Sequence, residues 1–169
     1  MKIGVLAVQG AFIEHEHIIE KIGHEVVEIR QRKDLDGIDG IILPGGESTV
    51  QGQLLRKLDM LATIKSLIAD GLPTLATCAG LILLAGHIDN DDSVHIGTLP
   101  VTVKRNAYGR QLGSFVRTAP MKGFDEFPMI FIRAPYISSI KDNVDVLAAV
   151  NDRIVAVQYN NPVSYTHLT

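Results

Sequence analysis

Hydrophobic and polar positions alternate with two different periods along the first half of the chain. Short apolar, β-branched runs predict strands, whereas longer stretches in which apolar residues recur every three or four positions predict helices. The predicted strands are 2–9, 24–29, 40–44 and 74–76, and the predicted helices are 12–22, 49–57 and 60–69. Strands without polar alternation are typical of a parallel sheet that is buried on both faces. We therefore expect a doubly wound α/β sheet with helices on both faces.

From about residue 95 the pattern changes to short strand-like pieces interrupted by Gly and Pro. Such pieces between His95 and Val116 predict antiparallel strands added to the edge of the sheet. The remaining predicted strands are 129–133, 144–150 and 153–159. A turn at Asn151-Asp152 is expected to join the last two. Because no repeat, low-complexity segment or linker interrupts the chain, we interpret residues 1–161 as a single domain.

Composition and charge argue against nucleic acid and membranes as partners. The chain has 169 residues, of which 46% are hydrophobic, as one compact domain requires. Its 16 Lys and Arg and 19 Asp and Glu are scattered, Trp is absent and the net charge is -3, so nucleic acid is not expected as a partner. No apolar run approaches the roughly 20 residues of a membrane helix, and the N-terminus lacks a signal-peptide pattern. We expect a cytoplasmic protein with a small ligand and no membrane association.

The single cysteine, Cys78, cannot form an internal disulfide or a thiolate zinc cage. It lies in LATCAGL (75–81), between an apolar strand and a helical run, with only small residues beside it. This context is typical of a nucleophile elbow, which places a strained residue at the carboxyl end of a sheet. A helix beginning after the cysteine is expected to lower the thiol pKa. The alternative is a buried cysteine that acts as a small hydrophobic residue, but the context favours a nucleophile.

A second feature is LPGGESTV (43–50), where a strand end is followed by two glycines, Glu47 and Ser48. Glycines allow bare backbone N–H groups to face a ligand, and such donors can stabilise an oxyanion. Glu47 and Ser48 can either cap the next helix or bind an ammonium group. The segment is not a phosphate loop, because the lysine of that motif is absent.

Histidines of the first predicted helix offer a candidate metal site that we reject. His15 and His17 lie two residues apart and therefore point about 200° apart around a helix, which does not suit two ligands of one ion. We interpret these residues as part of a solvated face and expect no metal site.

Five motifs occur together in an order that matches a known family: VQGAF (8–12), LPGGEST (43–49), TCAGLILLA (77–85), RNAYGRQLGSF (105–115) and FIRAP (131–135). On these motifs the chain resembles the glutaminase subunit of pyridoxal 5′-phosphate synthase, a class I, triad-type glutamine amidotransferase. The resemblance covers residues 1 to about 158. It implies a flavodoxin-like, three-layer α/β fold with a mainly parallel sheet, and no metal or organic cofactor in this subunit.

The resemblance also implies roles for individual residues. Cys78 is the expected nucleophile, which attacks the side-chain amide of L-glutamine, forms a thioester and releases ammonia. The backbone N–H groups of Gly46 and Ala79 are expected to form the oxyanion hole. The expected glutamine-binding residues are Gly46, Glu47, Ser48, Arg105, Ile132 and Arg133. The implied partner is a barrel-shaped synthase subunit in a large hetero-oligomer, which uses the ammonia to make pyridoxal 5′-phosphate.

The resemblance ends near the C-terminus. The family carries Ser-Phe-His-Pro-Glu-Leu-Thr, which supplies the general base and its orienting carboxylate, and then a final helix. Here the sequence is NNPVSYTHLT (160–169), in which His167 stands out of frame without the Pro or the Glu. We interpret residues 162–169 as an atypical tail, foreign or truncated, with the C-terminal helix missing. The alternative is that His167 is a displaced base.

Other functions remain open at this stage. The chain could be a docking subunit that binds glutamine without turnover, because the His-Glu part of the triad is missing. A glutaminase for another partner, such as imidazole glycerol phosphate synthase, is disfavoured by the RNxYGRQ and FIRAP motifs. A cysteine hydrolase or redox sensor unrelated to glutamine would leave the PGGES segment unexplained.

Overall fold

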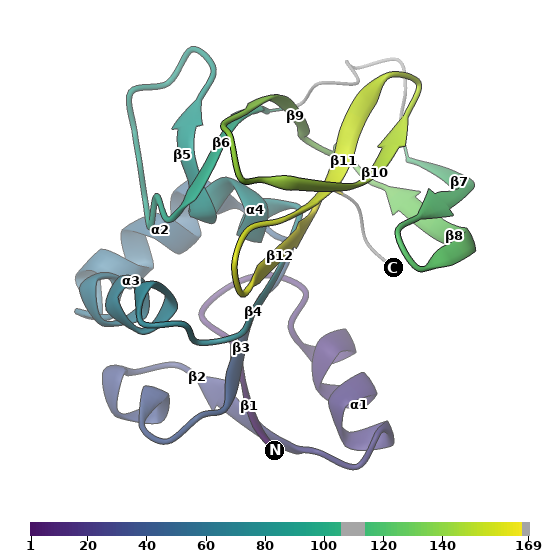
Figure 1. The fold of residues 1–169 in the computed structure, drawn as a ribbon. Coiled ribbons are helices and arrows are strands. Elements are labelled where there is room, and N and C mark those ends of the chain that lie inside the picture. The colour runs from purple at the N-terminus through teal and green to yellow at the C-terminus, as the bar shows by residue number, and fades with distance from the viewer. Residues whose placement is uncertain (106–113, 167–169) are drawn as a thin grey trace.

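The computed structural model describes residues 1–105 and 114–166. Its first half alternates strands and helices (Figure 1). The strands are β1 (Lys2–Leu6), β2 (Glu25–Ile29), β3 (Gly40–Leu43) and β4 (Thr74–Thr77). The helices are α1 (Ile13–Lys21), the 3-10 turn η1 (Arg32–Leu35), α2 (Ser48–Lys57), α3 (Leu61–Ala69) and α4 (Ala79–Leu84). Each predicted strand and helix of this half is present, with ends that differ by a few residues.

The second half consists of strands. They are β5 (Ala85–Ile88), β6 (Leu99–Lys104), β7 (Phe115–Met121), β8 (Phe124–Phe131), β9 (Tyr136–Ile140), β10 (Asp145–Val150), β11 (Arg153–Gln158) and β12 (Pro162–Tyr165). Within the described residues, ten strands form one sheet in the order β2-β1-β3-β4-β12-β11-β9-β6-β5, with β10 paired to β11. Strands β7 and β8 form a separate antiparallel pair beside β10 (Figure 1).

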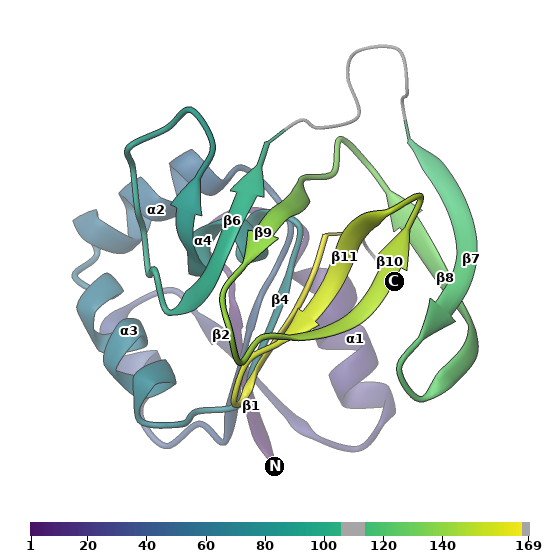
Figure 2. The same cartoon turned by 45° about the horizontal axis from the view of Figure 1, so that its top comes forward.

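Strands β2, β1, β3 and β4 pair in parallel, and helices cover both faces of this part of the sheet. Helix α1 lies on one face, whereas α2 and α3 lie on the other (Figure 2). Strand β3 is buried at all four positions, which explains its unbroken apolar sequence. The predicted doubly wound α/β fold is therefore confirmed.

Residues 162–165, which we expected to belong to an atypical tail, form strand β12 in the middle of the sheet. This strand pairs in parallel with β4 from Pro162↔Thr74 to Tyr165↔Thr77, and antiparallel with β11. It joins the parallel half of the sheet to the antiparallel half.

The strands at the far edge differ in part from the prediction. Strands β5 and β9 were not predicted, and β5 pairs with β6 in parallel, although antiparallel strands were expected at this edge. The segment 89–98 carries the chain back from the end of β5 to the level where β5 begins, so β6 runs in the same direction as β5. On its other side β6 pairs antiparallel with β9, and β9 pairs antiparallel with β11, in agreement with the expected antiparallel strands. The strand predicted at 129–133 is the end of the longer β8, which stops at Phe131.

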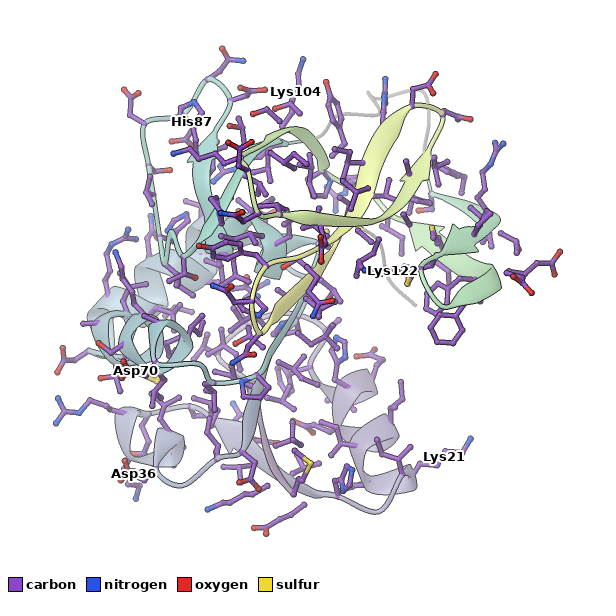
Figure 3. All side chains as sticks on the ribbon, in the orientation of Figure 1. Lys21, Asp36, Asp70, His87, Lys104 and Lys122 are labelled. Carbon is purple, nitrogen blue, oxygen red and sulfur yellow. The ribbon has the colours of Figure 1, made fainter. Side chains whose placement is uncertain are left out.

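The largest core lies between the sheet and helices α2, α3 and α4, where Leu55, Ile64 and Leu83 are fully buried. Smaller clusters lie under α1 and under the β7–β8 pair. No helix of the described residues combines the length and the apolar character needed to cross a bilayer. Exposed polar and charged side chains are spread around the molecule in Figure 3, where the labelled ones are Lys21, Asp36, Asp70, His87, Lys104 and Lys122.

Candidate active site

A cavity of about 400 Å³ lies at the carboxyl ends of β3 and β4. Its lining residues are Gln9, Ala11, Gly45, Gly46, Glu47, Ser48, Cys78, Ala79, Ile82, Arg105, Ile132, Arg133 and Pro135. They come from five parts of the chain that are distant in sequence. The structure thus brings together every predicted site residue except His167, which lies outside the described residues, as does Asn106–Gln111 of the arginine motif.

Cys78 has the strained backbone that the sequence predicts for an elbow. Its φ of 49° and ψ of -104° are unfavourable for a residue with a side chain, and it directly precedes α4. Two residues later the helix packs tightly on β3: a Cβ added at Gly80 would lie 2.1 Å from the Leu43 carbonyl oxygen. Close backbone packing therefore explains why a glycine occupies position 80.

The expected lowering of the Cys78 pKa is wrong. Burial raises the pKa of the thiol and is the largest influence, and the Glu47 carboxylate raises it further. The backbone N–H of Ala79 and the Arg133 guanidinium lower it, but they do not compensate for burial. The N-terminus of the short helix α4, with six residues, therefore does not outweigh the effect of burial on the pKa of the thiol.

The glycine loop after β3 is held by the loop after β1. The Ala11 N–H donates to the Gly45 carbonyl oxygen (3.0 Å), and the Glu47 N–H donates to Oε1 of Gln9 (2.9 Å). Gly46 has a φ of +155°, and a Cβ there would lie 2.5 Å from Gln9 Oε1. The close approach of the two loops explains why a glycine occupies position 46.

Helix α2 begins at Ser48, and the side chain of the preceding Glu47 does not cap it. Glu47 is the N-cap residue, but its side chain makes no capping hydrogen bond, and it is exposed in the cavity wall. Ser48 is only 5% exposed. Of the two alternatives for Glu47, binding of a cationic group therefore fits the geometry better than helix capping.

Arg105 is anchored by one of its terminal nitrogens. Its Nη1 lies 3.3 Å from Oγ1 of Thr49, to which it donates, and 3.2 Å from Oδ2 of Asp91. Its Nε and Nη2 are buried and have no hydrogen-bond partner in residues 1–105 and 114–166. Arg105 lines the cavity, where its positive charge favours an anionic ligand group.

Arg133 and Ile132 follow the end of β8. Arg133 has a φ of 43°, an uncommon value that turns the chain toward the cavity. Ile132 is 43% exposed and lines the same cavity.

Some residues of the site were not predicted. Gln9 and Ala11 line the cavity, and the VQGAF motif (8–12) was the signal that contained them. Thr49 and Asp91 were missed because they contact Arg105 and not the cavity itself.

Strand β12 ends next to the elbow. Its last residue, Tyr165, pairs with Thr77, the last residue of β4, so Thr166 and Cys78 directly follow the two paired strands. The Oγ1 of Thr166 is buried and has no hydrogen-bond partner among the described residues. In the part of the chain that the structure describes, no histidine lines the cavity and no group of three or more His, Cys, Asp or Glu is arranged for a metal ion.

Comparisons with known proteins identify the family of the chain. A model of the SNO glutamine amidotransferase family matches residues 5–167. A pyridoxal 5′-phosphate synthase subunit PdxT from Desulfitobacterium hafniense (strain DSM 10664 / DCB-2) is 56% identical over 164 residues, which are 96% of this chain and 82% of the relative. The PdxT subunit of Haemophilus influenzae (strain PittEE) is 53% identical over 95% of this chain and 86% of its own length.

A solved structure described as a glutamine amidotransferase superposes with a TM-score of 0.94 at 36% identity, covering 98% of this chain and 89% of its own. The resemblance inferred from the motifs is therefore confirmed at the level of both sequence and fold. The chain belongs to the SNO glutamine amidotransferase family.

Proposed function

We propose that this chain is a glutaminase that hydrolyses L-glutamine to glutamate and ammonia at Cys78 and delivers the ammonia to a pyridoxal 5′-phosphate synthase. The observation that carries the proposal is the cavity itself. It gathers a strained cysteine, a glycine loop and two arginines in a member of a glutamine amidotransferase family. Each of these groups matches a need of amide hydrolysis.

The reaction begins with the transfer of the Cys78 thiol proton to a base. The sulfur then attacks the side-chain amide carbon of glutamine, and a C–S bond forms as the carbonyl oxygen becomes an oxyanion. Backbone N–H groups of Gly46 and Ala79 stabilise this oxyanion. When the C–N bond breaks, the nitrogen takes the proton and leaves as ammonia. Water hydrolyses the remaining thioester, which gives glutamate and restores the thiol.

The charges of the cavity wall suit the two charged groups of the glutamine backbone. The Glu47 carboxylate is a partner for the ammonium group, and Ser48 lies next to it in the wall. Arg105 and Arg133 are partners for the carboxylate, to which a guanidinium can donate two hydrogen bonds. The apolar side chain of Ile132, which lines the same cavity, suits the methylene groups between Cα and the side-chain amide.

The reaction also needs a general base. Burial raises the pKa of Cys78, so the thiol needs a partner that accepts its proton. The sequence offers His167, two residues after Tyr165, which pairs with Thr77 directly before Cys78. We propose His167 as this base.

The partner completes the function. Ammonia released into solvent would be protonated and lost, so we propose that the chain docks on a barrel-shaped synthase subunit in a large hetero-oligomer in the cytoplasm. The relatives named above are themselves called synthase subunits, which supports a partner. The family model spans nearly the whole chain, which favours an active enzyme over a docking subunit without turnover.

The test is glutamate release from L-glutamine by this chain mixed with a pyridoxal 5′-phosphate synthase partner subunit. Cys78→Ala and His167→Ala are both expected to reduce turnover to background. His87→Ala, which changes an exposed histidine on β5, is the matched control and is expected to retain full activity. Absence of turnover in the parent chain would refute the glutaminase proposal. Normal turnover in His167→Ala would refute only the role of His167.

A further inference from the structure

Gln51 on α2 is a polar side chain with 0% exposure. Its Nε2 donates to the backbone oxygen of Gln9 at 3.0 Å and to that of Pro44 at 3.3 Å. These two carbonyl groups belong to different loops, one after β1 and one after β3. A single buried amide therefore ties together the two loops that form the floor of the cavity.

The two hydrogen bonds of the Gln51 amide lie next to the glycine loop. A Cβ added at Gly10 or at Gly46 would lie 3.2 Å from Nε2 of Gln51, so the amide packs directly against both glycines. The Ala11 to Gly45 hydrogen bond, which joins the same two loops, fixes the plane of the Gly45–Gly46 peptide. The direction of the Gly46 N–H therefore depends on how the two loops are held.

One polar atom of the Gln51 amide destabilises the fold. Its Oε1 is buried without a hydrogen-bond partner. An unpaired buried acceptor destabilises a fold, and an apolar side chain of the same length would avoid that loss. A polar side chain at this position therefore indicates that its donor group is needed.

We propose that Gln51 is a positioning residue that holds the Gly46 N–H in the orientation required to stabilise the oxyanion formed at Cys78. This inference rests on the proposed glutaminase function. The oxyanion exists in the transition state but not in bound glutamine. The hydrogen bonds of Gln51 are therefore expected to raise kcat and to leave KM almost unchanged.

The experiment uses Gln51→Met, which keeps the length of the side chain and removes both hydrogen bonds. With the synthase partner present, kcat for glutamate release is expected to fall about 10- to 100-fold, while KM stays within about twofold of the parent value. Gln53→Met changes an exposed glutamine of the same helix and serves as the control, with both constants unchanged.

A second measurement separates positioning from general damage. Alkylation of Cys78 by iodoacetamide forms no oxyanion, so its rate is expected to be the same in Gln51→Met and in the parent chain. A parallel fall in alkylation and turnover, an unchanged kcat, or a change confined to KM would each overturn the inference. If Gln51→Met does not fold, Gln51→Asn, whose amide is one methylene shorter, carries the same expectation.

The two proposals fail in different ways. A parent chain that reacts with iodoacetamide but releases no glutamate refutes the glutaminase function, and with it the role of Gln51. A parent chain with normal turnover and a Gln51→Met variant of equal kcat refutes the role of Gln51 alone.

Discussion

The parallel half of the sheet and the half that begins at β5 hold their parts of the site by different means. The parallel half fixes Cys78 and the glycine loop through backbone atoms in close contact. A Cβ at Gly10 would lie 2.1 Å from the Gly45 oxygen, and one at Gly80 equally close to the Leu43 oxygen. The second half presents Arg105 through side-chain contacts of 3.2 and 3.3 Å.

This difference separates two tasks of the site. Groups that act on the transition state need a fixed geometry, and backbone packing between a strand, an elbow and a helix provides it. The groups proposed to hold the carboxylate of the substrate tolerate more variation, and they are long arginine side chains. Substitutions in the first half are therefore expected to have abrupt effects, and those in the second half graded effects.

The largest effect is expected from Gly80→Ala. The added methyl group meets the Leu43 carbonyl oxygen, which belongs to the buried strand β3 and cannot move aside without breaking the sheet. We expect a loss of about 3 kcal/mol or more in the free energy of unfolding, measured by urea denaturation.

The control is Gly37→Ala, where φ is +70° and no atom lies within 4 Å of the added Cβ. That variant carries only the conformational strain of a left-handed residue, about 1–2 kcal/mol. Equal losses in the two variants would contradict the view that close packing fixes the elbow.

The same contrast explains which parts of the structure were predictable from the sequence. In the parallel half, apolar periodicity predicted strands β1 to β4 and helices α1 to α3, although not the 3-10 turn η1, and the small residues around Cys78 predicted the elbow. Local pattern is informative there because β3 is buried along its whole length, and the buried residues of α2 and α3 recur at helical spacing. The motifs also located Gly46, Ala79 and the charged residues that line the cavity.

In the second half, local pattern carries less information. Strands β5 and β9 are short and partly exposed, and their pairing depends on partners that are distant in sequence.

Two features of the parallel half were also not predictable from local pattern. Burial of Cys78 reverses the pKa shift expected from the helix terminus, because desolvation is a property of the assembled fold. Gln51 gave no signal, since a polar residue in an amphipathic helix is normally read as exposed.

A graded effect is expected from Asp91→Asn. Asp91 holds Nη1 of Arg105 at 3.2 Å, and the two side chains are 31% and 27% exposed. The variant keeps the shape but loses the charge, so Arg105 becomes less fixed. We expect KM for glutamine to rise about three- to tenfold, with kcat almost unchanged.

Asp92→Asn, on the same loop, is the control and is expected to leave KM unchanged. A fall in kcat without a change in KM would show that Arg105 acts on the transition state. In that case the division of tasks between the two halves would be wrong.

A smaller effect, of opposite sign, is expected at the β10–β11 turn. Asn151 and Asp152 both have positive φ, at 50° and 60°, as a two-residue hairpin turn requires. Asp152→Gly removes the strain at one of these positions and should stabilise the fold by about 0.5–1 kcal/mol. Thermal denaturation measures the gain, and a lower midpoint would show that the aspartate makes a compensating contact.

The smallest expected effect lies where the two halves meet at Cys78. Glu47, from the parallel half, raises the pKa of the thiol, whereas Arg133, from the second half, lowers it. Iodoacetamide reacts with the thiolate, so the alkylation rate increases with pH through that pKa. Because burial dominates, the midpoint in the parent chain is expected above the ordinary cysteine value of about 8.5.

Glu47→Gln removes a raising influence and should move the midpoint to lower pH, and Arg133→Gln should move it to higher pH. Both side chains are exposed, so solvent screens them and each shift should be roughly a few tenths of a pH unit, decreasing as salt is added. Shifts in the same direction would mean that the substitutions act by changing burial of the thiol. Opposite shifts would show that charges from both halves of the sheet act on the Cys78 sulfur atom. A bound substrate or a neighbouring base would change the sum of these two influences on the thiol pKa.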